Sequence, residues 1–304
     1  MNILVTGSAG FIGQQLGLKL ADEGHNLLGL WHDRQPFRCS RWHSLTGDIL
    51  DYERMLEIIV NNEIDEIFHL ASKAIVRNCR TDPLGCLRTN VMGTANILEA
   101  ARQSERVQGI VVAESDKSYG SVHVPYHEYQ ALRPTAIYES SKACVSHLMT
   151  AYAENYGVPV ASIRMANVYG PGDPNHSRLV PNTILRVLRG EKPQITAGAE
   201  QYRREFIHVD DACEAYIRVM DAKPWGQAIN VGSGECHTVR ETVEIICHAM
   251  GVDAEPEEWA RPATLHEIKS QWLCIDKLKE IWPDFKPLTM AETLPDIIQW
   301  DKYN

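Results

Sequence analysis

The chain has 304 residues, 44% hydrophobic content and a formal net charge of -10, so it is long enough for one large domain with a smaller companion. The acidic balance excludes a protein that binds nucleic-acid backbones through clustered Lys and Arg, and no nucleic-acid partner is expected. Its longest apolar runs are shorter than the roughly 18 residues of a membrane span, and we see no secretion signal, so we expect a cytoplasmic protein without a membrane partner.

Short apolar runs alternate with amphipathic stretches through the first half of the chain. This alternation is typical of a doubly wound α/β fold, in which helices cover both faces of a parallel sheet. The predicted strands span residues 3–6, 26–31, 66–70, 109–113 and 160–164. The predicted helices include residues 11–23, 52–62 and 83–103.

The pattern changes after about residue 167, where turns rich in Pro and Gly are followed by short mixed elements. We therefore predict a Rossmann domain over residues 1–166 and a smaller, mainly separate α/β domain over residues 167–304. A segment near residues 205–232 is expected to return to the first domain, since residues 227–231 are apolar enough to add a strand there.

A glycine-rich turn, Gly7-Ser8-Ala9-Gly10-Phe11-Ile12-Gly13, follows the first predicted strand and opens the first predicted helix. Gly7 permits a tight turn, Gly10 lets the backbone approach a pyrophosphate, and Gly13 lets the helix pack closely on the strand. The spacing GxxGxxG is typical of the short-chain dehydrogenase branch of dinucleotide-binding proteins. The turn therefore predicts that a pyrophosphate binds at the helix N-terminus.

Polar residues after the predicted strand 26–31, and at the end of a further short strand that reaches Asp48 and Ile49, indicate which dinucleotide binds. Asp33 lies about 20 residues after the turn, where a carboxylate accepts hydrogen bonds from the ribose hydroxyls and repels a 2′-phosphate. We therefore expect NAD. The neighbouring Arg34 keeps NADP as the less favoured alternative. Asp48 and Ile49 are placed for the adenine ring, with an N-cap role for Asp48 as the equally weighted alternative.

The first catalytic candidates are Tyr138 and Lys142, which form a YxxxK pattern at the start of a predicted helix. This spacing puts the phenol and the ammonium on one face of the helix. A fixed ammonium and a cationic oxidised nicotinamide would both stabilise the phenolate, so Tyr138 could remove the proton of a sugar hydroxyl. The same Tyr and Lys could instead be exposed residues without a role.

The next candidates are Ser115, Asp116 and Lys117, at the carboxyl end of the fourth predicted long strand, where α/β sheets bind ligands. Ser115 can hydrogen-bond the reacting hydroxyl. Oxidation of a hydroxyl to a ketone does not need a further acid and base beside the serine. Elimination of water next to a ketone does, with Lys117 as the base and Asp116 as the acid. The alternative is a solvated ion pair in a loop.

Together these residues resemble the extended short-chain dehydrogenase/reductase family of nucleotide-sugar epimerases and dehydratases, over nearly the whole chain. Within it the chain looks most similar to CDP-glucose 4,6-dehydratases. The segments that carry this resemblance are Gly29 to Asp33, Phe68 to Ala71, Val76-Arg77, Asp82-Pro83, Thr89 to Thr94 and Ser115-Asp116-Lys117.

The resemblance implies oxidation at C4 by Tyr138 and Lys142 with help from Ser115, loss of water across C5 and C6 through Asp116 and Lys117, and hydride return to C6. It also implies further binding residues. We expect cofactor contacts from Phe11, Ile12, Leu70 and Ala71, and substrate contacts from Asn167, Arg178, Arg204 and Arg261. The nucleotide base and the sugar stay open.

Two other functions are weighed against the dehydratase. A nucleotide-sugar 4-epimerase would use Ser115, Tyr138 and Lys142, but it does not need an acid and a base after the serine. A non-catalytic, NAD-binding regulatory protein would have no physical requirement for Tyr138 or Lys142. The resemblance also implies a homodimer that pairs helices near residues 83–103 and 138–156. The eight cysteines and the histidines show no metal-ligand spacing, so no metal is expected.

Overall fold

The computed structural model describes residues 1–33, 42–260 and 267–303. Its main sheet has seven parallel strands in the order β10-β6-β5-β4-β1-β2-β3. These are β1 (Asn2–Thr6), β2 (Asn26–Trp31), β3 (His43–Thr46), β4 (Glu66–His69), β5 (Gly109–Ser115), β6 (Val160–Met165) and β10 (Ala228–Val231). The predicted Rossmann-type fold is confirmed.

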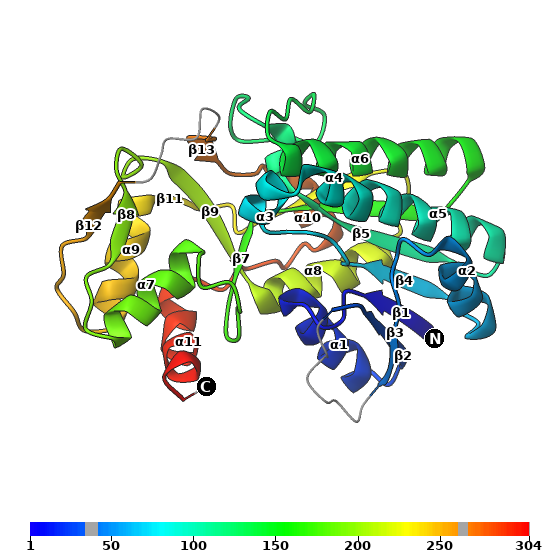
Figure 1. The fold of residues 1–304 in the computed structure, drawn as a ribbon, viewed down its shortest axis with the longest axis horizontal. Coiled ribbons are helices and arrows are strands. Elements are labelled where there is room, and N and C mark those ends of the chain that lie inside the picture. The colour runs from blue at the N-terminus through cyan, green and yellow to red at the C-terminus, as the bar shows by residue number, and fades with distance from the viewer. Residues whose placement is uncertain (34–41, 261–266, 304) are drawn as a thin grey trace.

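Helices cover both faces of this sheet, and successive strand residues pack into different cores (Figure 1). Ile3 and Val5 of β1 join a core with α1 (Phe11–Asp22) and α8 (Val209–Ala222). Leu4, between them, packs into a second core formed with α2, α5 and α6. The strands are apolar on both sides because a parallel sheet is covered on both sides.

The helices on the face of the second core differ from the sequence prediction at one point. They are α2 (Tyr52–Asn61), α3 (Val76–Thr81), α4 (Pro83–Leu87), α5 (Gly93–Ser104) and α6 (Ile137–Tyr156). The helix predicted over 83–103 is interrupted by a π-helical turn, η1 (Arg88–Met92). This wider turn carries Asn90, which donates to Ser141 Oγ of α6 at 2.9 Å and accepts from Lys73 N at 2.7 Å.

The second half of the chain forms a smaller α/β unit beside the main sheet, on the left in Figure 1. Strand β9 (Arg203–His208) pairs with three others. The elements of this unit and of the C-terminal segment are β7 (Asn167–Tyr169), α7 (Leu179–Leu188), β8 (Gln194–Thr196), β11 (Cys236–Thr238), α9 (Val239–Ala249), β12 (Glu257–Trp259), β13 (Ser270–Gln271), α10 (Asp276–Ile281) and α11 (Met290–Tyr303). In the ranges described, none of the helices has the length and apolar character needed to cross a membrane.

The chain returns from the smaller unit to the main sheet through α8 and β10, which pairs with β6. The strand expected over residues 227–231 is thus present in the main sheet. A single cut at residue 166 would therefore separate β10 from the sheet that it completes.

His69, the last residue of β4, is buried and fixed as a neutral ring by two threonines. Thr94 Oγ1 donates to Asn90 O at 2.6 Å, so His69 Nε2 must donate to Thr94 at 3.0 Å. His69 Nδ1 then accepts from Thr6 Oγ1 at 2.8 Å. Burial, aided by the charge of Lys142, lowers the pKa of His69 to about 3. Protonation would break this arrangement.

We expect His69 to make stability fall on acidification. Between its unfolded pKa near 6.5 and its folded pKa near 3, the unfolded chain binds the extra proton, so the free energy of unfolding decreases as the pH falls. From pH 7 to pH 5 this one group accounts for about 2 kcal/mol. Urea unfolding at both pH values should show a smaller decrease for His69→Gln than for the unaltered chain.

The exposed His248 of α9 provides the control for this prediction. His248→Gln should leave the pH dependence as it is in the unaltered chain. An equal decrease in all three proteins would contradict the assignment of this effect to His69.

Candidate active site

The glycine turn joins β1 to α1 and is shaped by close backbone packing. Gly7 has a φ of +71°, and a Cβ there would lie 2.8 Å from Ala71 N. A Cβ on Gly13 would lie 2.3 Å from Gly7 O. Both positions therefore require glycine, for the reasons that the sequence pattern predicts.

The N-terminus of α1 is suited to a phosphate. Its N-cap is Gly10, which supplies no side-chain cap, and no acidic residue lies in the first turn of this helix. The first backbone N–H groups of the helix, near Phe11 and Ile12, are therefore left to an anionic ligand. This backbone cradle fits the pyrophosphate of a dinucleotide, and the contacts of these residues with it stay a prediction.

The residues proposed for the adenosine end lie close together after β2 and β3. Asp33 is exposed and contacts His32 Nδ1, while His32 Nε2 lies 3.6 Å from Asp48 Oδ2. The alternative of Asp48 as a helix N-cap is wrong, because Asp51 caps α2 by accepting from Arg54 N at 3.0 Å. Asp48 instead accepts from Leu50 N.

The other cofactor candidates differ in their placement. The side chain of Ile49 is buried against Gly93, and its carbonyl accepts from Asn96. Leu70 and Ala71 follow β4, and both donate backbone hydrogen bonds to Thr6 beside the glycine turn. Arg34, the residue that would favour NADP, lies outside the described residues.

Tyr138 and Lys142 lie on the first turns of α6 and are both buried. Lys142 Nζ donates to Ala113 O of β5 at 2.8 Å, which fixes the ammonium against the central strand. Burial lowers the pKa of Lys142 to about 8, although the nearby Glu114 opposes this effect. Burial also raises the pKa of Tyr138, against a hydrogen bond with Ser115. A phenolate at Tyr138 therefore needs positive charge beside it.

Ser115, Asp116 and Lys117 form the end of β5 and the start of a 3-10 turn, η2 (Asp116–Tyr119). Ser115 Oγ donates to Asp116 Oδ1 at 3.2 Å, and Lys117 Nζ lies 3.6 Å from the same oxygen. Asp116 is only 1% exposed, so the alternative of a solvated ion pair is wrong. Through Ser115, this segment meets Tyr138.

The candidate substrate residues reach this segment from the smaller unit. Asn167 Oδ1 accepts from Lys117 Nζ at 3.1 Å. Arg204 is largely buried and donates to the carbonyls of Arg203 and Lys269. Arg178 forms an ion pair with the buried Asp173 at 3.3 Å, close enough to Tyr138 for its charge to oppose the rise in the pKa of that tyrosine. Arg261 lies outside the described residues.

Sequence reasoning missed several polar residues next to the candidate site. Gln271 Nε2 contacts Asp116 Oδ2 at 3.5 Å. Glu205 is buried, which raises its pKa to about 8, and it accepts from Gly234 N and Leu273 N. Glu114 is buried beside Ser115. The only sequence signal was at Glu114, a charged residue at the end of an otherwise apolar strand.

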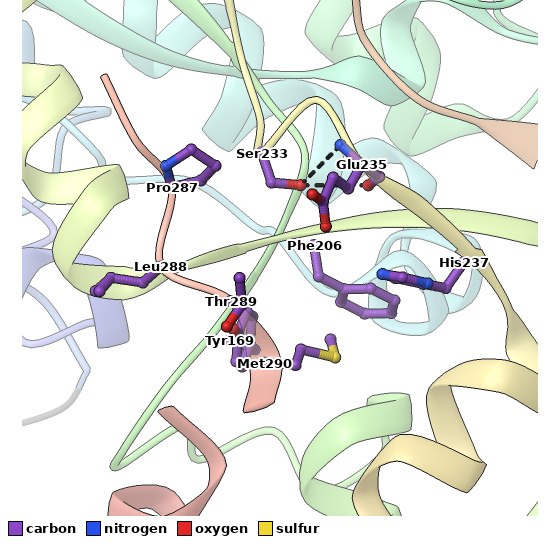
Figure 2. Close-up of a pocket in the computed structure, with 9 residues that line it drawn as sticks. All are labelled: Tyr169, Phe206, Ser233, Glu235, His237, Pro287, Leu288, Thr289 and Met290. Carbon is purple, nitrogen blue, oxygen red and sulfur yellow. Dashed lines mark hydrogen bonds between the residues drawn. The ribbon is translucent and has the colours of Figure 1, made fainter. Parts of the chain in front are cut away.

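A small hollow lies in the smaller unit between β9, the loop before β11 and the start of α11 (Figure 2). Phe206 and His237 form one side, while Leu288 lies opposite and Ser233 bonds Glu235 at the rim. No predicted site residue lines it. The candidate catalytic residues instead lie at the end of β5 and the start of α6.

The comparison with protein families finds one match over most of the chain. Residues 3–232 match the model described as the NAD dependent epimerase/dehydratase family. A UDP-N-acetyl-alpha-D-glucosaminuronate decarboxylase of Bacillus cytotoxicus is 30% identical, over 98% of this chain and 96% of the relative. A trifunctional UDP-glucose 4,6-dehydratase/UDP-4-keto-6-deoxy-D-glucose 3,5-epimerase/UDP-4-keto-L-rhamnose-reductase of Arabidopsis thaliana is 28% identical over 84% of this chain, which spans only 40% of that relative.

Solved structures of two different activities are similar to this one. The UDP-glucose 4-epimerase of Thermotoga maritima, solved with UDP-glucose, has a TM-score of 0.91 and 28% identity, over 99% of this chain and 98% of its own. The dTDP-glucose 4,6-dehydratase DesIV of Streptomyces venezuelae, solved with NAD and TYD bound, has a TM-score of 0.91 and 25% identity, over 100% and 98% of the two chains.

Proposed function

The chain belongs to the NAD dependent epimerase/dehydratase family, and from that premise we propose that it is a nucleotide-sugar 4,6-dehydratase. The observation that carries this proposal is the buried Asp116 beside Lys117, in contact with Ser115. An acid and a base at this position serve an elimination and are superfluous in simple oxidation and reduction. NAD is assigned over NADP because Asp33 presents an exposed carboxylate after β2.

The first step is oxidation at C4 of the hexose. The glycine turn and Asp33 would hold NAD, whose chemistry would be to take up the hydride of C4 and to supply the hydride for C6. Ser115 would hold the C4 hydroxyl while Tyr138 takes its proton. The ammonium of Lys142, fixed on Ala113 O, would stabilise the phenolate that this transfer needs.

The second step is loss of water across C5 and C6. The C4 ketone makes the neighbouring C5–H acidic. Lys117 would take that proton, the C6–O bond would break, and Asp116 would protonate the departing hydroxyl so that it leaves as water. Lys117 would return its proton to C5 when C6 is reduced, which leaves a 4-keto-6-deoxy sugar. The proton that Tyr138 took from the C4 hydroxyl would pass through water to Asp116, which restores all three residues.

The proposal extends to the substrate contacts and the assembly. Asn167, Arg178 and Arg204 would contact the diphosphate or the sugar, and Arg261 would also bind the diphosphate. A homodimer is proposed through α4 to α6, where Leu84 and Met92 are exposed apolar residues. The resemblance to CDP-glucose 4,6-dehydratases makes CDP-glucose the first substrate to test.

The proposed reaction is tested with a panel of substrates. CDP-, UDP- and dTDP-glucose, together with nucleotide-linked N-acetylhexosamines, are incubated with the chain and NAD and analysed by mass spectrometry. We expect one of them to lose a single water. A product of unchanged mass with inverted C4 would instead support the second candidate, a 4-epimerase, which the similarity to the Thermotoga maritima enzyme favours. No change with any substrate would favour a non-catalytic NAD-binding protein.

A further inference from the structure

We infer that Glu114 is a positioning residue for the acid and base of the proposed dehydration, and that it acts through Ser118. This inference rests on the proposed function. Glu114 and Ser118 lie on either side of the segment Ser115-Asp116-Lys117. Neither is expected to contact the substrate.

Glu114 is held in one place by a buried ion pair between neighbouring strands. Glu114 of β5 and Arg164 of β6 are direct partners in the sheet register. Arg164 Nε donates to Glu114 Oε1 at 3.0 Å, and both side chains are buried. A charge pair that is buried and hydrogen-bonded in this way has little freedom to move.

Ser118 connects this carboxylate to the acid–base segment. Its hydroxyl lies 2.9 Å from Glu114 Oε1 and 2.7 Å from Ser115 O. Ser115 Oγ in turn accepts from Lys117 N at 3.2 Å. Asp116 and Lys117 therefore lie in a short turn whose two ends are fixed, and one of these ends is fixed by Glu114.

The same ion pair also contacts the helix that carries the oxidation residues. Arg164 Nη2 donates to Ser146 Oγ of α6 at 2.7 Å. Ser146 is one helical turn beyond Lys142 and two beyond Tyr138, on the same face. The Glu114–Arg164 pair thereby sets the position of the elimination residues relative to the oxidation residues.

Two buried serines permit a matched test. Ser162 of β6 donates to the other oxygen of Glu114, Oε2, at 2.9 Å. Ser118→Ala and Ser162→Ala each remove one hydroxyl from the same carboxylate, but only Ser118 belongs to the acid–base turn. Both serines are fully buried, so we expect the two variants to show similar, modest decreases in unfolding temperature.

Their catalytic effects should differ. Ser118→Ala is expected to slow water loss by about 10- to 100-fold with little change in KM. Oxidation at C4 should continue, so reduced nicotinamide should accumulate and be seen by its absorbance. Exchange of the C5 hydrogen with heavy water should become slower. Ser162→Ala should stay within about twofold of the unaltered chain. Glu114→Gln should repeat the effect of Ser118→Ala, with a larger loss of stability because Arg164 then lacks its partner.

Equal rates in the two serine variants would overturn the inference, as would a parallel loss of oxidation and water loss in Ser118→Ala. The unaltered chain separates these results from failure of the proposed function. If it loses water from no member of the substrate panel, the dehydratase proposal itself fails. If it does lose water and the serine variants behave alike, only the role of Glu114 fails.

Discussion

Lys117→Met is expected to lower the rate of water loss by about 10³-fold, because methionine has a similar length but cannot accept the C5 proton. In the unaltered chain, Lys117 Nζ lies 3.1 Å from Asn167 Oδ1 and 3.6 Å from Asp116 Oδ1. Tyr138 and Lys142 are untouched, so oxidation at C4 should still occur. Mass spectrometry of the product and absorbance of reduced nicotinamide together separate the two steps.

The control for Lys117 is Lys279, an exposed lysine of α10. Lys279→Met should keep the full rate of water loss. A Lys117→Met chain that still eliminates water at an unchanged rate would remove Lys117 from the reaction, and another group would have to take the C5 proton. Retention of NAD by the variant must be verified, since loss of the cofactor would imitate the expected result.

Tyr138→Phe is expected to abolish both steps, with a decrease in rate of about 10³- to 10⁴-fold. The ring of Tyr138 is buried against Cys79 and Cys86, and phenylalanine fills the same space, so the fold should survive. Only the hydroxyl that takes the C4 proton is lost. No reduced nicotinamide should form with any substrate, in contrast to Lys117→Met.

The matched control is Tyr152→Phe, because Tyr152 lies on the same helix, α6, as Tyr138. Its hydroxyl contacts Glu99 at 3.4 Å and lies outside the proposed site, so this variant should retain activity. Reduced nicotinamide in Tyr138→Phe at the rate of the unaltered chain would show that another base accepts the C4 proton.

The parts of the fold and site that could be predicted are those with a local signal. The glycine turn follows a strand directly, and Tyr138 and Lys142 are four residues apart, so sequence spacing alone places them. Ser115, Asp116 and Lys117 were located because polar residues end an apolar strand. In each case the residues that act together are neighbours in sequence.

The parts that could not be predicted depend on contacts between distant residues. Glu114 meets Arg164 across 50 positions, and Gln271 meets Asp116 across 155. No periodicity in either segment encodes such a contact. The π-helical turn was missed for the same reason, since Asn90 at this turn bonds to Ser141 of another helix.

The route of the chain through the sheet limits how this enzyme can exchange parts with its relatives. Because α8 and β10 lie between β9 and its partners β11 and β13, the smaller unit is built from stretches on both sides of the segment that returns to the sheet. A single recombination event at residue 166 would deliver a foreign α8 and β10 together with a foreign substrate unit. New substrate specificity is therefore expected to arise from coordinated crossovers on both sides of α8 and β10, or from point substitutions within the smaller unit.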